Sequence, residues 1–192
     1  MKNYSLQTAL LCLLVFSCIE ICNGQDANLL TVNNPFDSLV ISNVKAIGNK
    51  TTGALKITMD FMNISQKHQT AHLSLGGFED FGITSNQGKR YKVFSAQNVI
   101  GNSQPNSGFQ KIAAVQFGSK TLDWVTSLIQ ELNPGDKRTL SVSIGKFDKV
   151  DRQIKNLHIR CILFIGYKHS GDKNYIVENI PIEWTETTSK VK

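Results

Sequence analysis

The 192-residue chain carries 21 basic and 15 acidic residues, a formal net charge of +6, and no run of lysines or arginines. A small, dispersed excess of this kind does not indicate a nucleic-acid partner, whereas attraction to an anionic cell surface or an acidic glycan is compatible with it. The length fits one domain that can bury a core of its own.

Residues 1–24 have the pattern of a secretory signal peptide. One early lysine precedes an apolar stretch over about residues 9–19, and Gly24 stands before the polar QDAN. The apolar stretch is too short to span a membrane, so we expect cleavage after Gly24 and a secreted, periplasmic or cell-surface location. The alternative is a lipid anchor at Cys18, because VFSC resembles a bacterial lipobox, although Phe16 is large for its position.

The positions of the cysteines exclude an intrachain disulfide in the mature chain. Cys12, Cys18 and Cys22 lie in the signal, so that Cys161 alone would remain. An exported domain without a disulfide depends on its hydrophobic core for stability.

After a polar lead-in at residues 25–37, apolar and polar side chains alternate with a period of two through residues 38–184. This period is typical of half-buried β-strands. The first two strands are predicted at 39–48 and 55–64, on either side of the turn NKTTG (49–53). The start of the domain is therefore predicted to be a hairpin.

Two methionines and two histidines fall close together in MDFMNISQKHQTAH, residues 59–72. On a strand Met59 belongs to the apolar face and Met62 to the opposite one, so the two sulfurs do not converge. On an extended segment His68 and His72 share a face but lie about 13 Å apart, too far to bind one ion. A loop could bring them together, so a periplasmic metal-handling protein using His68, His72 and Met62 is an alternative hypothesis.

A second hairpin is predicted from strands at 77–84 and 89–95 around the turn SNQG (85–88). Residues 97–111 follow and are the most loop-like part of the mature chain. A loop of this length in a compact domain is commonly functional or mobile. We expect it to contact a partner through Asn98, Asn102, Gln104, Asn106 and Phe109.

Aromatic residues border this loop and offer faces on which a sugar or a peptide could stack. They are Phe78, Phe81, Tyr91, Phe94 and Phe109. Those at alternating strand positions are expected in the core. Phe109 is expected to be exposed, because it has loop residues on both sides and no strand register to bury it.

The segment 120–132 is ambiguous, because its apolar residues also fit a helical stripe. We favour a strand, as in its neighbours, and keep a short helix as the alternative. After the turn NPGD (133–136), further strands are predicted at 138–147, 156–167 and 175–184. Pro181 places the last strand at an edge or beside a bulge, and the tail 185–192 is expected to be loose.

No catalytic motif is visible: the chain has no nucleophile elbow, no HExxH and no phosphate-binding glycine loop. His158 and Arg160 share one face of a strand, and Cys161 falls on the other as a small buried hydrophobe. Asn49 and Asn63 begin acceptor patterns for N-glycosylation, which matter only in a eukaryotic host. No catalytic residue and no cofactor is predicted.

The order of the strand GALKITMDFMN, the strand-turn-strand GITSNQGKRYKV, the turn and strand LNPGDKRTLSVSI and a penultimate apolar strand carries a resemblance. It resembles the telokin-like, immunoglobulin-like extracellular domains of bacterial exported proteins and lipoproteins. The resemblance implies an all-β, antiparallel immunoglobulin-like β-sandwich of about eight strands over residues 38–184. It also implies a non-enzymatic adhesion, scaffold or ligand-binding module, without the antibody-type disulfide.

We therefore expect a secreted or surface-tethered binding module that meets a protein or glycan partner at the cell surface. Two alternatives remain open at this stage. One is the metal-handling protein described above, and the other is a hydrolase whose site is dispersed over loops, which leaves no sequence spacing to detect.

Overall fold

The computed structural model describes residues 29–94, 108–121 and 126–186, and all of its regular elements are β-strands. Within these ranges no helix is long and apolar enough to cross a membrane. The strands, in chain order, are β1 (Thr31–Asn33), β2 (Leu39–Asn49), β3 (Leu55–Asn63), β4 (Gln69–Ser74), β5 (Phe81–Ser85), β6 (Arg90–Lys92), β7 (Phe109–Lys111), β8 (Ala114–Phe117), β9 (Lys120–Thr121), β10 (Ser127–Leu132), β11 (Lys137–Ile144), β12 (Gln153–Ile165) and β13 (Lys168–Thr185).

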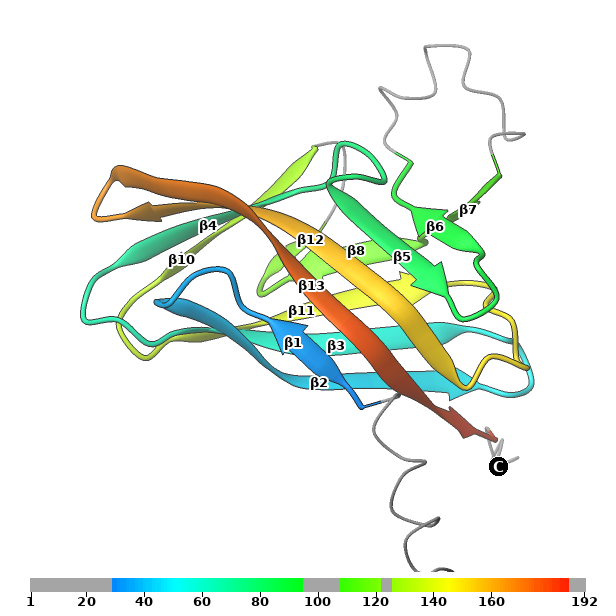
Figure 1. Cartoon of the computed structure of the whole chain (residues 1–192). Coiled ribbons are helices and arrows are strands. Elements are labelled where there is room, and N and C mark those ends of the chain that lie inside the picture. Colours follow the sequence, from blue (N-terminus) through cyan, green and yellow to red (C-terminus); the bar gives the residue numbers. More distant parts are fainter. Residues whose placement is uncertain (1–28, 95–107, 122–125, 187–192) are drawn as a thin grey trace, which may run out of the picture.

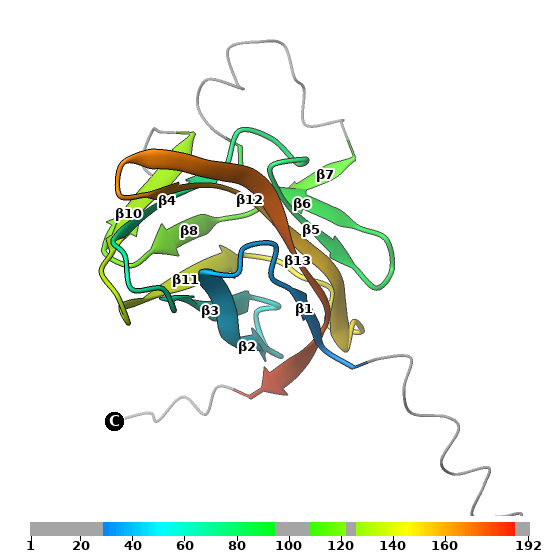
Figure 2. The ribbon, with the colours of Figure 1, turned by 60° about the vertical axis from the view of Figure 1, so that its left-hand side comes forward.

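The thirteen strands form one continuous sheet, with the order β7-β6-β5-β12-β13-β2-β3-β11-β8-β9 along its main path. β4 also pairs with β12, β10 with β4, and β1 with β13. The sheet curls so that β12, β5 and β4 face β2, β3 and β11 across the interior (Figures 1 and 2). We call these the upper half and the lower half of the sheet.

The long strand β13 joins the two halves. Most of it runs antiparallel to β12 in the upper half, and its last four residues run parallel to β2 in the lower half. Pro181 stands where the strand changes partners: it is opposite Gln153 of β12, and the next residue, Ile182, is opposite Ala46 of β2. Asn179 just before it has a left-handed φ of 56°, but β13 lies between β12 and β2 and its register with β12 is unbroken here, so the prediction of an edge strand or a bulge at Pro181 is wrong.

Alternation along the strands builds the core between the halves. In β3, Ile57, Met59 and Phe61 are fully buried, while Met62 on the other face is 37% exposed. The Phe61 ring packs edge-on against Tyr175 of β13 at 5.1 Å and against Phe117 of β8 at 5.2 Å. Met59 is therefore a core residue, as predicted, and the two halves share one hydrophobic cluster.

The all-β prediction is confirmed, but the predicted antiparallel sandwich of about eight strands differs from the structure in two ways. β13 with β2 and β6 with β7 are parallel pairs, so the sheet is mixed. The count is thirteen, because several two- to four-residue strands such as β7 and β9 are too short to show alternation. One of them, β1, lies inside the predicted polar lead-in.

The alternative of a helix near 120–132 is wrong for the part of that segment that the structure describes. Lys120 and Thr121 form β9, and Ser127–Leu132 form β10, which pairs with β4 in antiparallel register. Its side chains alternate between buried and outward positions, with Leu128 and Leu132 in the core and Ile129 44% exposed. The strand prediction is thus confirmed at both described ends.

Two polar residues of β3 are buried with partners. Asn63 is fully buried, and its amide nitrogen donates to the carbonyl oxygens of Lys67 and Leu132, so a glycan on this nitrogen would replace one of the two donor hydrogens. Asp60 accepts hydrogen bonds from Asn43 of β2 and Thr139 of β11. These bonds hold the pKa of the Asp60 carboxyl below its usual value.

Candidate binding surface at strands β6 and β7

The predicted binding residues fall into two groups. Asn98, Asn102, Gln104 and Asn106 lie outside the described residues. Phe109 is described, and it is the first residue of β7 rather than part of a loop. It is partly buried, so the expectation of an exposed side chain without a strand register is wrong.

The register of β5, β6 and β7 decides which side chains share a face. β6 pairs with β7 in parallel, with Arg90 opposite Phe109 and Lys92 opposite Lys111. Tyr91, between the two cations of β6, is 1% exposed and points into the core. Because side chains alternate along a strand, these four partners lie together on the outer face of the upper half.

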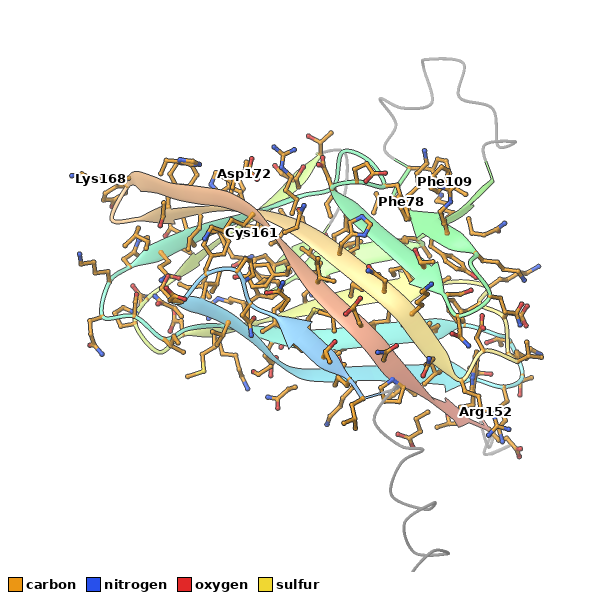
Figure 3. All side chains as sticks on the ribbon, viewed as in Figure 1. Phe78, Phe109, Arg152, Cys161, Lys168 and Asp172 are labelled. Atoms are coloured by element: carbon orange, nitrogen blue, oxygen red, sulfur yellow. The ribbon has the colours of Figure 1, made fainter. Side chains whose placement is uncertain are left out.

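Two phenylalanines, one from a connection and one from β7, pack together on this face. The ring centroids of Phe78, in the β4–β5 connection, and Phe109 lie 5.1 Å apart, and Figure 3 shows the two side chains beside each other. On its other side the Phe78 ring meets His158 of β12 edge-on at 5.0 Å. His158 Nε2 also lies in hydrogen-bonding contact with the carbonyl oxygen of Phe78.

Gly82 forms the floor beneath this packing. An added Cβ at Gly82 would lie 2.6 Å from the His158 ring and 2.7 Å from the Phe78 ring, and 2.6 Å from the Phe78 carbonyl oxygen. Distances this short are steric overlaps, so Phe78 and His158 can pack against β5 only because Gly82 has no side chain.

Both cations of β6 lie over the aromatic rings. The Arg90 guanidinium carbon is 4.4 Å from the Phe109 centroid and 5.7 Å from that of Phe78. The Lys92 ammonium nitrogen is 4.7 Å from the Phe109 centroid and 4.9 Å from that of Phe94. These distances are within the range of cation–π attraction. We call these five residues, Phe78, Phe94, Phe109, Arg90 and Lys92, the aromatic–basic cluster.

The positive charge continues from the cluster into an open cleft beside β7. The cleft has a volume of about 410 Å³ and is lined by Gln110, Lys111, Ala113, Gly145 and Lys146. A smaller cleft of about 230 Å³ shares Gln110 and Lys146 with it and also contains Lys89 and Asp148. Lys89 is paired with Asp148 at 2.7 Å, which raises the pKa of the lysine and lowers that of the carboxyl.

The remaining cations of this surface lack such partners among the described residues. Arg90, Lys92, Lys111 and Lys146 form no ion pair with any carboxylate that the structure places. Three of them are on strands β6 and β7, and Lys146 follows the end of β11. Such a concentration of cations without acidic partners in the described chain is a physical basis for binding an anion.

The structure places the predicted metal-site residues on different elements. His72, on β4, packs against Phe164 at 4.9 Å, and burial lowers the pKa of its imidazole. His68, before β4, lies 3.8 Å from the Glu131 carboxylate. His72 and Met62 project from the outer faces of the upper and the lower half, respectively. Within the described ranges, no three His, Cys, Asp or Glu residues are grouped so that they could hold a metal ion.

Cys161 occupies the position predicted for it. It lies on the inner face of β12 with no exposed surface, and burial raises the pKa of the thiol to about 12. Phe81 and Tyr91 are buried in the core in the same way. Of the aromatic residues that border the loop, Phe78, Phe94 and Phe109 therefore form the surface cluster.

The four unpaired cations were missed by sequence reasoning. The segments KRYK and FQK do carry a signal, because cations and aromatics alternate in them. The convergence of Arg90 and Lys92 with Lys111 depends on the parallel pairing of β6 with β7, which no local turn predicts. Lys146 comes from the connection after β11.

Comparison with known proteins gives little further guidance. No protein-family model matches the chain, and no curated protein matches it. Among solved structures, the chain is similar to the CooA pilin subunit from enterotoxigenic Escherichia coli, with 10% sequence identity and a TM-score of 0.38. The alignment covers 77% of this chain and 99% of that one. The surface at β6 and β7 is therefore interpreted from its own geometry.

Proposed function

We propose that this chain is a secreted or surface-tethered, non-enzymatic binding module with an immunoglobulin-like β domain at residues 38–184. It would bind a protein or glycan partner through the surface formed by β6, β7 and the adjacent cleft, which we call the β6–β7 corner. Its export would depend on the signal at residues 1–24, with cleavage after Gly24 or lipidation at Cys18. The contact surface would comprise the aromatic–basic cluster and the chain between Phe94 and Gly108, including Asn98, Asn102, Gln104 and Asn106.

The observation that carries this proposal is a pair of cations, Arg90 and Lys92, that lie over partly buried aromatic rings and have no acidic partner in the described part of the chain. A stacked cation loses little conformational entropy on binding, because its side chain is already held in place. Rigid aromatic anchors with adjacent polar groups are typical of binding surfaces. The connection between Phe94 and Gly108 starts and ends beside this cluster, so residues within it could reach the same partner.

The experiment measures binding of the labelled mature chain to intact cells of its own host. Replacing residues 98–107 with a Gly/Ser segment of equal length tests the connection, and Phe109→Ser tests the cluster. Equal length matters, because β6 and β7 run parallel and the chain between them has to return along the strands. We expect both variants to lose most of the binding while they still unfold cooperatively.

Arg152→Gln is the matched control. Arg152 is exposed, and Figure 3 shows it at the lower edge of the molecule, away from Phe109 at the upper edge. Binding that survives both changes at the β6–β7 corner would contradict the proposed function. Binding that is lost equally in Arg152→Gln would contradict it as well, because it would point to net charge rather than to this surface.

A further inference from the structure

We infer that the ligand of the β6–β7 corner is an acidic polysaccharide, whose carboxylate or sulfate groups bind Arg90, Lys92, Lys111 and Lys146 along a path from the aromatic–basic cluster into the 410 Å³ cleft. This inference rests on the proposed function and assigns a ligand class to the same surface. It uses described residues only.

The first step is the state of Arg90. Its guanidinium stacks on Phe109, with the side chain of Phe78 close by. Stacking uses the face of the guanidinium and leaves the N–H donors in its plane, where they suit the two oxygens of a carboxylate or a sulfate. No described residue receives a hydrogen bond from this side chain in the structure. Arg90 is thus an oriented donor that has no anionic acceptor among the residues that the structure places.

The second step is the arrangement of the lysines. Lys92 is two residues after Arg90 on the same face, about 6.8 Å along the strand. Lys92 and Lys111 are directly opposite each other in the β6–β7 register, and like charges in this position repel across a strand pair. Lys111 then lines the cleft together with Lys146. An anion with several charges would relieve this repulsion and would follow a continuous row of cations.

The third step is the character of the cleft. Apart from its lysines it is lined by Gln110, Ala113 and Gly145, which offer polar or small surfaces and no deep apolar pocket. Helical and proline-rich peptides are recognised in apolar or aromatic-lined grooves, and here the rings of Phe78 and Phe109 are already in contact with Arg90. A hydroxyl-rich polymer with anionic groups fits a lining of cations and one amide better than a peptide does.

The experiment uses the full mature chain and four probes: heparin for sulfate groups, polygalacturonate for carboxylate groups, dextran as a neutral polysaccharide and poly-glutamate as an acidic peptide. Affinities are measured by isothermal titration calorimetry at low and high ionic strength. We expect heparin or polygalacturonate to bind more tightly than poly-glutamate, and dextran not to bind. The affinity for the acidic polysaccharide should fall as the salt concentration rises, because salt screens the attraction between the cations and the anionic groups.

Variants then locate the site. Arg90→Gln and Lys111→Gln should each weaken polysaccharide binding by about tenfold, the loss of one charge-assisted contact. Arg152→Gln and Lys56→Gln remove the same charge from exposed positions that are in neither the aromatic–basic cluster nor the lining of the 410 Å³ cleft, and should change affinity less than about twofold. Equal losses in all four variants would overturn the inference, because only net charge would then be acting.

Other outcomes separate this inference from the proposed function. Tighter binding of poly-glutamate, sensitive to Arg90→Gln, would replace the polysaccharide by an acidic peptide and leave the proposed function in place. Dextran binding that requires Phe109 would show that the ligand need not be anionic, which would overturn the inference and leave the proposed function in place. If no probe binds while Phe109→Ser still abolishes binding to host cells, the inference fails and the proposed function stands.

Discussion

Two arginines on the outer face of the upper half have opposite surroundings. Arg160 of β12 donates from Nε and Nη2 to the Asp172 carboxylate at 2.9 and 2.6 Å, and from Nη1 to Asp80 at 3.0 Å. Arg90 of β6 has no carboxylate partner in the described chain and lies over the rings of Phe78 and Phe109. The comparison separates an arginine that connects elements of the fold from one whose donors remain open to a ligand.

The charge environment of Arg160 follows from its contacts. Hydrogen bonds from Arg160 hold the pKa of the Asp172 carboxyl below its usual value, and the two carboxylates raise the pKa of the guanidinium. Asp172 is on β13, the strand that follows β12, and Asp80 is in the connection before β5, so Arg160 links the β12–β13 hairpin to a segment that lies 80 residues earlier in the sequence. Arg90 forms no ion pair that links segments of the described chain in this way.

The largest expected effect comes from disturbing the aromatic packing beside Arg90. Gly82→Ala should lower the free energy of unfolding by about 2 kcal/mol, because the new Cβ overlaps Phe78 and His158. Gly77→Ala is the control, since a Cβ there meets nothing within 4 Å. Urea unfolding monitored by fluorescence measures both. Equal stability of the two variants would show that Gly82 is not the floor of the cluster.

Next in size is the effect of acid on the Arg160 network. The folded-state pKa of Asp172 is lowered, so its contribution to stability is present above the usual value of 3.8 and is lost as the pH falls below it. Arg160→Gln should therefore unfold at a lower temperature than the wild type near neutral pH, and the difference should shrink toward pH 2. Melting temperatures across this pH range test it. Parallel curves for the two proteins would contradict the role of the pair.

A smaller effect of the Arg160 network is expected on the rate at which Cys161, its neighbour on β12, reacts with a thiol reagent. The buried thiol, with its pKa raised to about 12, should be almost unreactive toward a disulfide reagent in the native protein. Arg160→Gln should speed its labelling, because β12 and β13 open more readily without the ion pairs. If Arg90→Gln raised the labelling rate of Cys161 as much as Arg160→Gln does, the proposed difference between the two arginines would be wrong.

The smallest effect on stability is expected for Arg90→Gln. The substitution removes cation–π contacts on the surface, so we expect a change of about 0.5 to 1 kcal/mol in the free energy of unfolding. The same variant should nevertheless weaken ligand binding strongly. Urea unfolding beside the calorimetric titration measures both quantities. A stability loss as large as that of Arg160→Gln would mean that Arg90 serves mainly the fold.

Local sequence predicted the longer elements well. β2, β3, β11 and β12 were predicted within a few residues of their bounds. β3 and β11 alternate along their length between core and outer positions, β2 alternates on either side of an irregularity at Asn43, and β12 is a long apolar run. The turns were found for the same local reason: Gly88 and Gly135 have positive φ values of 79° and 78° at the predicted positions. These features depend on contacts between residues close together in the chain.

The candidate surface could be predicted only in part. Phe109 and the aromatic residues at the edge of the loop were singled out, but Arg90, Lys92, Lys111 and Lys146 were not. The length of the connection before Phe109 indicated a functional loop, and the parallel pairing of β6 with β7 supplies a structural reason for that length.

The sequence by itself determined that the chain is all-β, which side chains of its long strands enter the core, and that Cys161 is a buried thiol. It did so because the two-residue period of a strand depends only on residues that are close together in the sequence. The tertiary structure decided the parallel pairs, the passage of β13 from one half to the other at Pro181, and the meeting of Arg90 with Phe109. Those depend on which strands lie side by side, and strand neighbours far apart in the sequence leave no periodic trace in either segment.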